Sequence, residues 1–195
     1  MKNLAHFFFE VGMLKRTPRT GFQFLGSGAE SVAEHSFRTA IIGFALARLD
    51  GQADVARVLQ LCLFHDLPEA RLGDLNYVNK KYVTADEQRA VDDLAATLPF
   101  GDEYRATLGE FAARETREAL LAHDADQLEM ILALKEYKDL GNRYADEWYP
   151  FAVRRLKTDL ARKLAESIWS TDSTRWWFDE DQDWWVNGGR PSMQE

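Results

Sequence analysis

Apolar residues recur every three or four positions along most of this chain, which is the period of an amphipathic helix. No segment alternates with the two-residue period of a strand for long enough to indicate a sheet. The pattern predicts helices, in chain order, over residues 3–15, 31–49, 54–67, 84–97 and 104–111, then from 116 onward, and from after 150 through 168. The predicted fold class is therefore all-α, a helical bundle.

Two capping boxes and a glycine mark predicted helix ends. Ser31 and Glu34 have the spacing in which a serine and a glutamate satisfy unpaired amides at a helix start. Thr84 and Glu87 repeat that spacing. Gly51 follows the second predicted helix, where it can adopt the left-handed conformation that ends a helix.

The predicted helix over residues 54–67 is apolar on most faces, so it lies inside the fold. Its apolar run ends in an adjacent histidine and aspartate, His65 and Asp66. Burying a carboxylate beside an imidazole costs several kcal/mol unless something compensates for the lost hydration. A divalent metal ion would compensate both groups, so the pair is a candidate metal site.

Further candidate ligands lie elsewhere along the chain. His35 is in the first turn of the predicted helix over residues 31–49, and Asp124 and Asp126 lie in the long helix that begins near residue 116. Two imidazoles and two carboxylates suit Mn, Co, Fe, Zn or Mg. The helical pattern leaves Asp124 and Asp126 open as alternatives, because that helix is apolar on most sides.

Composition excludes several classes of protein. The chain has 195 residues, a length that suits one domain, and it is 46% hydrophobic. A net charge of -8 argues against nucleic acid or an anionic membrane as a partner. No apolar run approaches the ~20 residues of a membrane-spanning helix. A single cysteine, Cys62, rules out a disulfide framework and favours a reduced, cytoplasmic setting.

The basic loop 15–21 contains Arg16 and Arg19 and is stiffened by Pro18. The simplest interpretation is a solvated turn. The functional interpretation is a phosphate clamp, since arginine presents a planar fork to phosphate oxygens. Arg16 and Arg19 are therefore candidate substrate-binding residues.

Five segments together resemble the HD-domain phosphohydrolases, and within them the 5'-deoxynucleotidase-like branch. The family pattern is His…His-Asp…Asp on an all-helical fold, and the segments that carry the resemblance are 14–21, 30–36, 64–69, 73–75 and 124–128. The resemblance implies one HD domain over residues 1–195 with a tryptophan-rich extension over 170–195. It also implies that His35, His65, Asp66 and Asp126 hold one divalent metal in the core of the bundle.

The same resemblance assigns three further roles. Glu69 would assist catalysis, Asp74 would lie near the sugar, and Arg16 would hold the phosphate. A homodimer is expected, and the tail that contains Trp176, Trp177, Trp184 and Trp185 could form such a contact or pack on the core.

The expected reaction is metal-dependent hydrolysis of a (deoxy)nucleoside 5'-monophosphate to nucleoside and phosphate, so the partner is a small nucleotide. One alternative is a (d)NTP triphosphohydrolase, which would release tripolyphosphate and need more basic side chains, some of which Lys80 and Lys81 could supply. A second alternative is a non-catalytic nucleotide-binding module with a structural metal.

Overall fold

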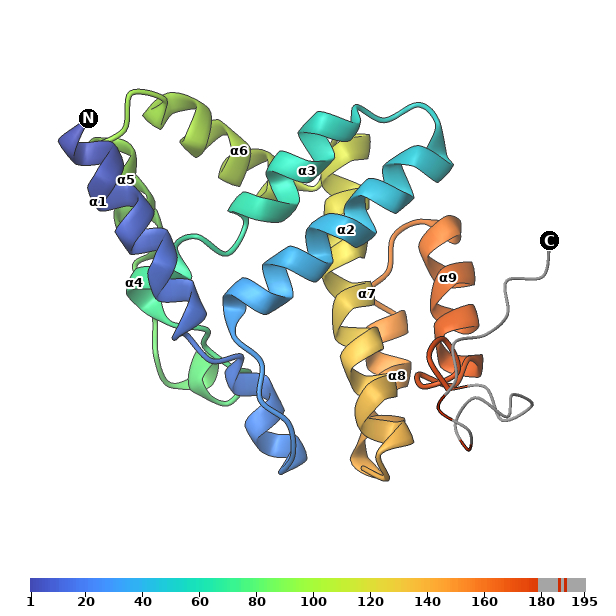
Figure 1. Cartoon of the computed structure of the whole chain (residues 1–195). Helices are drawn as coiled ribbons and strands as arrows, with labels where there is room; N and C mark the ends of the chain where they lie inside the picture. Colours follow the sequence, from blue (N-terminus) through green and yellow to red (C-terminus); the bar gives the residue numbers. More distant parts are fainter. Residues whose placement is uncertain (179–185, 187, 189–195) are drawn as a thin grey trace.

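The regular structure is helical throughout the part of the chain that the computed structural model describes, which comprises residues 1–178, 186 and 188 (Figure 1). The predicted all-α class is confirmed. The α-helices are α1 (Lys2–Val11), α2 (Val32–Asp50), α3 (Val55–Phe64), α4 (Glu69–Leu72), α5 (Glu87–Ala95), α6 (Gly101–Ala113), α7 (Arg117–Asp139), α8 (Tyr144–Val153) and α9 (Asp159–Ser170). Short 3-10 helices cover Gly12–Lys15, Thr20–Leu25 and Asn79–Lys81.

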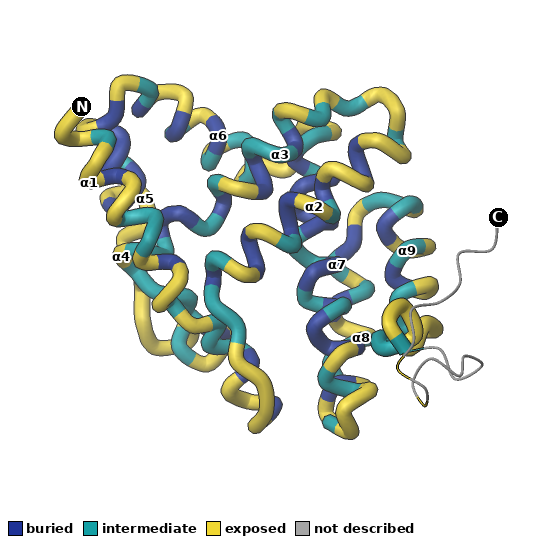
Figure 2. Tube along the Cα trace, in the orientation of Figure 1, coloured by how far each residue is buried: buried dark blue, intermediate teal, exposed yellow. Residues whose placement is uncertain are grey.

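Helix α7 is the centre of the bundle. It contacts α2, α3, α6, α8 and α9, and α2 crosses it near the middle of the molecule (Figure 1). Its apolar residues face several directions, and the buried parts of α2, α3 and α7 meet along it (Figure 2). A helix that is apolar on most sides is stable only when other helices surround it, which explains this central position.

Two apolar clusters form the core. The larger cluster joins α2, α3, α7, α8 and α9, and it includes Leu46, Leu61 and Leu128. The smaller joins α1, α5 and α6, and it includes Val32 at the start of α2 and Leu67 after α3. Helix α2 and the segment that follows α3 therefore pass from one cluster to the other, and their polar residues lie at the border.

The predicted ends of α2 are confirmed. Ser31 and Glu34 form the reciprocal capping box, and Gly51 has φ +73° and donates its backbone N–H to Ala47 O. The predicted capping box at Thr84 is wrong. Helix α5 begins one residue after Asp86, whose carboxylate accepts from the backbone N–H of Arg89. An aspartate directly before a helix reaches these amides well, so it displaces the threonine two positions earlier.

The prediction that residues 148–150 precede a single helix is also wrong. They lie inside α8, and α9 begins after the Thr158 cap, whose hydroxyl accepts from Ala161 N. The apolar period continues across the break because Leu156 in the linker is buried in the same cluster as both helices.

The predicted contact of the tryptophan-rich tail stays a prediction. Trp176 in this tail is 85% exposed. Trp184 and Trp185, also part of the predicted tail contact, lie outside the described residues. Among the residues that are described, no helix combines the length and apolar character needed to cross a membrane.

Candidate metal centre and substrate cleft

Three helical segments direct polar side chains to one point at the border of the two apolar clusters. The capping box at Ser31 fixes the first turn of α2, which carries His35. His65 directly follows the last residue of α3, and Asp66 is next in the same turn. Asp126 lies near the middle of α7, between the buried residues of the larger cluster.

The four predicted ligands lie together. His35 Nε2 is 3.2 Å from Asp126 Oδ1 and 3.5 Å from Asp66 Oδ2. His65 Nε2 is 3.2 Å from Asp66 Oδ2 and 4.0 Å from Asp126 Oδ1. Both imidazoles are buried, and the two carboxylates are at most one-fifth exposed.

These atoms fit a divalent cation. His35 Nε2, His65 Nε2 and Asp66 Oδ2 are buried and have no hydrogen-bond partner within the described residues. Nitrogen and oxygen ligands ~2.1 Å from one cation are about 3.0–3.4 Å apart, close to the separations found here. His35, His65 and Asp126 also offer ligand atoms that all lie within 4.8 Å of one another.

Each imidazole uses its second nitrogen for a hydrogen bond. His65 Nδ1 lies 2.8 Å from the backbone oxygen of Cys62, which can only accept, so Nδ1 carries the proton. His35 Nδ1 lies 2.6 Å from Glu129 Oε2. Both contacts leave Nε2 facing Asp66 and Asp126, which is the orientation of a metal ligand.

The electrostatics of the cluster favour a cation. Burial and the charge of Arg19 lower the pKa of His35, but Asp126 and Glu129 outweigh them and raise it to about 10. Burial alone would raise the pKa of Asp126, yet His35, His65 and Arg19 hold it well below its usual range. The cluster therefore keeps carboxylates ionised and attracts positive charge, which a divalent metal supplies on displacing protons.

Glu69 is the first residue of α4, three positions after Asp66. Its Oε2 is buried and has no hydrogen-bond partner within the described residues. Burial, with the negative charges of Asp66 and Asp74, raises the pKa of Glu69 to about 9. A carboxyl group that keeps its proton at neutral pH can act as a general acid.

Arg19 reaches this cluster from the loop after the first 3-10 helix. Its Nη1 lies 3.6 Å from Asp66 Oδ2, and its side chain is 16% exposed. Burial would lower the pKa of Arg19, but Asp66, Asp126 and Asp74 raise it above its usual range, so the guanidinium stays charged. Arg16 is exposed, and it is not among the residues that line the cleft. Its predicted phosphate contact stays a prediction.

Asp74 is tied to the same loop. Its Oδ2 accepts from the backbone N–H of Thr20 at 2.8 Å, and its backbone oxygen accepts from the Thr20 hydroxyl at 2.6 Å. The two bonds fix the loop that carries Arg19 against the turn after Gly73. They also leave Asp74 Oδ1 available for another contact.

A cleft of ≈ 390 Å³ opens over these groups. Asp66, Glu69, Asp74 and Asp126 form its acidic wall, and Arg19 lies beside them. The remaining wall has aromatic, aliphatic and basic side chains: Phe22, Phe24, Tyr77, Met130, Trp148, Lys80 and Arg155. Arg155 lies over the Tyr77 ring at 5.0 Å. The cleft therefore combines an acidic wall with a wall of aromatic, aliphatic and basic side chains.

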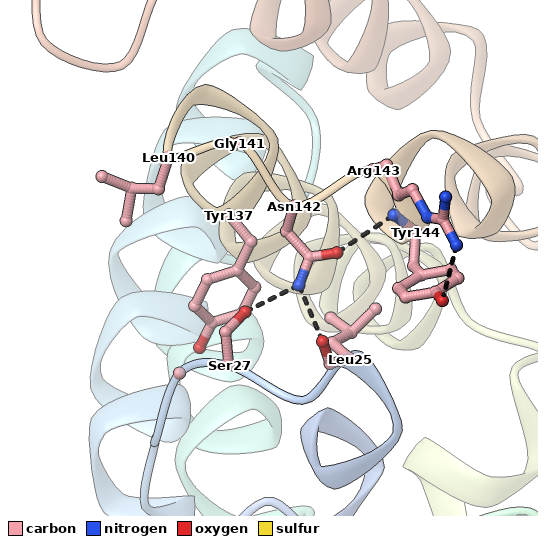
Figure 3. Close-up of a pocket in the computed structure, with 9 residues that line it drawn as sticks. Leu25, Ser27, Tyr137, Leu140, Gly141, Asn142, Arg143 and Tyr144 are labelled. Atoms are coloured by element: carbon pink, nitrogen blue, oxygen red, sulfur yellow. Dashed lines mark hydrogen bonds between the residues drawn. The ribbon is translucent and has the colours of Figure 1, made fainter.

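A second hollow, of ≈ 390 Å³, lies between the segment that ends at Leu25 and the turn joining α7 and α8 (Figure 3). Asn142 Nδ2 donates to Leu25 O at 2.8 Å and to Ser27 Oγ at 2.6 Å. Its Oδ1 accepts from Tyr144 N. The amide is thus occupied in joining two segments, and we regard this hollow as a structural junction.

Asp124 faces away from the metal centre. It is fully buried, and its carboxylate accepts from the backbone N–H of Lys157 and from the N–H and hydroxyl of Thr158 at 2.7–2.8 Å. These bonds anchor the linker between α8 and α9. His123 is also buried, with Nδ1 3.8 Å from Asp124 Oδ1.

Two residues of the site were not predicted from the sequence. Glu129 contacts His35, and Arg38 binds the other oxygen of Glu129. The available signal was spacing, since Glu129 is one helical turn after Asp126 and Arg38 is one turn after His35.

The chain is similar to known proteins in sequence and in structure. The family model described as "HD domain" matches residues 11–169. The chain is similar to 5'-deoxynucleotidase HDDC2 of Bos taurus, with 34% identity over 148 residues that cover 73% of this chain and 71% of the relative. It is also similar in structure to a conserved hypothetical protein from Pyrococcus furiosus, with a TM-score of 0.71, 33% identity, and coverage of 84% of this chain and 96% of that one. A predicted metal-dependent phosphohydrolase from Magnetospirillum magnetotacticum gives a TM-score of 0.69 at 26% identity and covers 86% of this chain and 89% of that one.

Proposed function

The chain belongs to the HD domain family, and from this premise we propose that it hydrolyses deoxynucleoside 5'-monophosphates to nucleoside and phosphate. The observation that carries the proposal is a cluster of two imidazoles and two carboxylates. Nε2 of His35 and Nε2 of His65 each lie 3.2–4.0 Å from a carboxylate oxygen of Asp66 and of Asp126, and the two aspartates line the cleft. Glu69 and Arg19 adjoin them, so an acid and an anion-binding group face the same space.

We propose one divalent ion, drawn from Mn, Co, Fe, Zn or Mg, held by His35, His65, Asp66 and Asp126. The mixed nitrogen and oxygen donor set is compatible with each of these metals. When bound, such an ion supplies Lewis-acid polarisation of the phosphoryl group and lowers the pKa of a water.

The chain's own residues provide the remaining catalytic groups. Arg19 is charged and nearly buried beside Asp66, so it can neutralise phosphate oxygens as negative charge develops. We assign to Glu69 the protonation of the leaving 5'-oxygen, because Glu69 lines the cleft beside Asp66 and its buried Oε2 has no hydrogen-bond partner within the described residues. Arg16 remains a second proposed phosphate contact from the basic loop.

The rest of the cleft suits a nucleoside. Asp74 has one carboxylate oxygen held by Thr20 and the other available to a sugar hydroxyl. Tyr77 and Trp148 line the cleft and can contact a base, and Arg155 lies over one face of the Tyr77 ring. We therefore place the phosphate beside Arg19 and the base against these rings.

The test is a panel of deoxynucleoside and ribonucleoside monophosphates and deoxynucleoside triphosphates, assayed with each divalent metal. We expect inorganic phosphate from the deoxynucleoside monophosphates, and none from Asp126→Asn. Release of tripolyphosphate would instead identify a triphosphohydrolase. Nucleotide binding by the metal-loaded protein without turnover would identify a non-catalytic module and overturn the proposal.

We further propose that the protein is a cytoplasmic homodimer. Each chain would form one domain over residues 1–195, with residues 170–195 as an extension. Phe37, Ile41 and Phe44 support the dimer, because they are each more than 40% exposed and lie on one side of α2. Light scattering tests the assembly: a dimer has twice the chain mass of 22.4 kDa.

A further inference from the structure

A buried carboxylate lies directly behind one of the candidate metal ligands. Glu129 is fully buried in α7, one turn after Asp126, and its Oε2 is 2.6 Å from Nδ1 of His35. Glu129 uses this oxygen to contact the ring from the side opposite Asp66 and Asp126. It is therefore placed to control the ring without occupying the cleft, whose lining does not include it.

The other oxygen of Glu129 is held by Arg38. Arg38 donates to Glu129 Oε1 through Nε at 2.9 Å and through Nη2 at 2.6 Å, which is a two-point contact. Its remaining Nη1 donates to Glu136 Oε1 at 2.7 Å. Because Arg38 holds Oε1 and His35 holds Oε2, the carboxylate of Glu129 has a fixed plane and a compensated charge, which a buried acid requires.

We infer that Glu129 is a positioning residue of the metal centre. It holds the proton of His35 on Nδ1, fixes the plane of the ring, and leaves the Nε2 lone pair directed at the site between Asp66 and Asp126. Arg38 keeps Glu129 in the orientation that this role needs. The inference rests on the metal site of the proposed function, and it does not depend on the substrate.

The two imidazoles differ in this respect. His65 donates to a neutral backbone oxygen, that of Cys62, whereas His35 donates to an ionised carboxylate. A carboxylate partner makes an imidazole a stronger electron donor and restrains it more firmly. We therefore expect His35 to contribute more to metal affinity than His65 does.

The experiment measures zinc affinity by competition with a chromophoric chelator. Glu129→Gln keeps the shape of the side chain and removes its charge, and we expect the dissociation constant for zinc to rise about 10–100-fold. Glu136→Gln is the matched control, because it makes the same change on another partner of Arg38 that does not touch His35. We expect that control to remain within twofold of the unmodified protein.

A structural role alone would give a different result. It would lower the melting temperature of the metal-free variant and leave zinc affinity unchanged. Two-bond 1H–15N spectra of the zinc-loaded protein give an independent readout, since we expect the Nδ1 resonance of His35 to shift in Glu129→Gln while that of His65 stays. Glu129→Asp, which retains the charge, should recover part of the affinity.

Arg38→Met provides a second variant if Glu129→Gln does not fold, and we expect it to weaken zinc binding at least threefold. Zinc affinity within twofold of the unmodified protein in Glu129→Gln, or in Arg38→Met where only that variant folds, overturns the inference. Failure of the unmodified protein to bind zinc also overturns it. Zinc binding without phosphate release would contradict the proposed activity and leave this inference in place.

Discussion

At Glu69, burial and the neighbouring charges of Asp66 and Asp74 all disfavour the ionised form, so its pKa is about 9. The same carboxyl group in the unfolded chain ionises near its ordinary pKa of 4.5. Between these values the folded protein binds more protons than the unfolded one. The free energy of unfolding therefore decreases as pH rises through this window, in the metal-free protein.

Glu69→Gln removes this dependence. We expect the metal-free variant to melt a few degrees above the unmodified protein at pH 8, and the difference to vanish near pH 4.5, because 1 kcal/mol corresponds to about 2–4 °C at this chain length. Calorimetry at both pH values measures it, with the exposed Glu115→Gln as control. An equal melting difference at both pH values would contradict this expectation.

The same Glu69→Gln variant should also lose about 100-fold in kcat and keep its metal.

The two arginines of the basic loop differ in exposure, and this predicts different effects. Arg19→Met should lower kcat/KM for a deoxynucleoside monophosphate about 100-fold, because it removes a charge from the cleft. Arg16→Met should lower it no more than tenfold, since its side chain is exposed. Steady-state kinetics of both variants measure the ratio. A larger loss in Arg16→Met would place the main phosphate contact on Arg16.

At the residue scale, the sequence predicted those site residues that belong to a local motif. His65, Asp66 and Glu69 are within five positions of one another, in the turn between α3 and α4 and at the first residue of α4. Glu129 and Arg38 each lie one helical turn from a predicted ligand, but no local motif joins them, because their ion pair links positions 91 residues apart. A buried charge has an identifiable role only when its partner in the fold is known.

At the scale of elements, the helical period predicted where helices lie better than where they end. Leu156 keeps the apolar period through the linker between α8 and α9, since a buried linker residue meets the same core as a helical one. The start of α5 depended on which of two neighbouring polar residues, Thr84 or Asp86, capped it. Such choices depend on local backbone geometry, which a hydrophobic pattern does not contain.

Asp124 and Asp126 both lie in α7, and variants of the two residues test which of them binds the metal. Asp124→Asn should lower the free energy of unfolding by about 2–4 kcal/mol, because it disturbs three hydrogen bonds that anchor the start of α9. It should keep zinc affinity nearly unchanged. Asp126→Asn should instead lower zinc affinity at least tenfold, because it removes a candidate ligand from the cluster. Denaturant unfolding and zinc titration of both variants distinguish these outcomes, and loss of zinc in Asp124→Asn would contradict the assignment.

For the whole molecule, the proposed metal centre lies where α2, α3 and α7 meet at the border of the two apolar clusters. Its proposed ligands come from all three helical segments, so no single helix can form the site. The unfolded chain therefore has no comparable site, and a bound ion stabilises only the folded state. The free energy of metal binding therefore adds to the free energy of unfolding of the bundle.

Removal of the metal should consequently destabilise the entire bundle. An ion present at 100 times its dissociation constant adds ~2.7 kcal/mol to the free energy of unfolding, which corresponds to a rise of about 5–10 °C in Tm for a chain of this length. We expect Tm to rise with the logarithm of zinc or manganese concentration and to return to its starting value with a chelator. Asp126→Asn, whose zinc affinity is expected to be at least tenfold weaker, should show a rise in Tm about half as large or smaller at the same zinc concentration. An equal shift in that variant would mean that the ion stabilises the protein from another site, and the four-ligand centre would not be the cause.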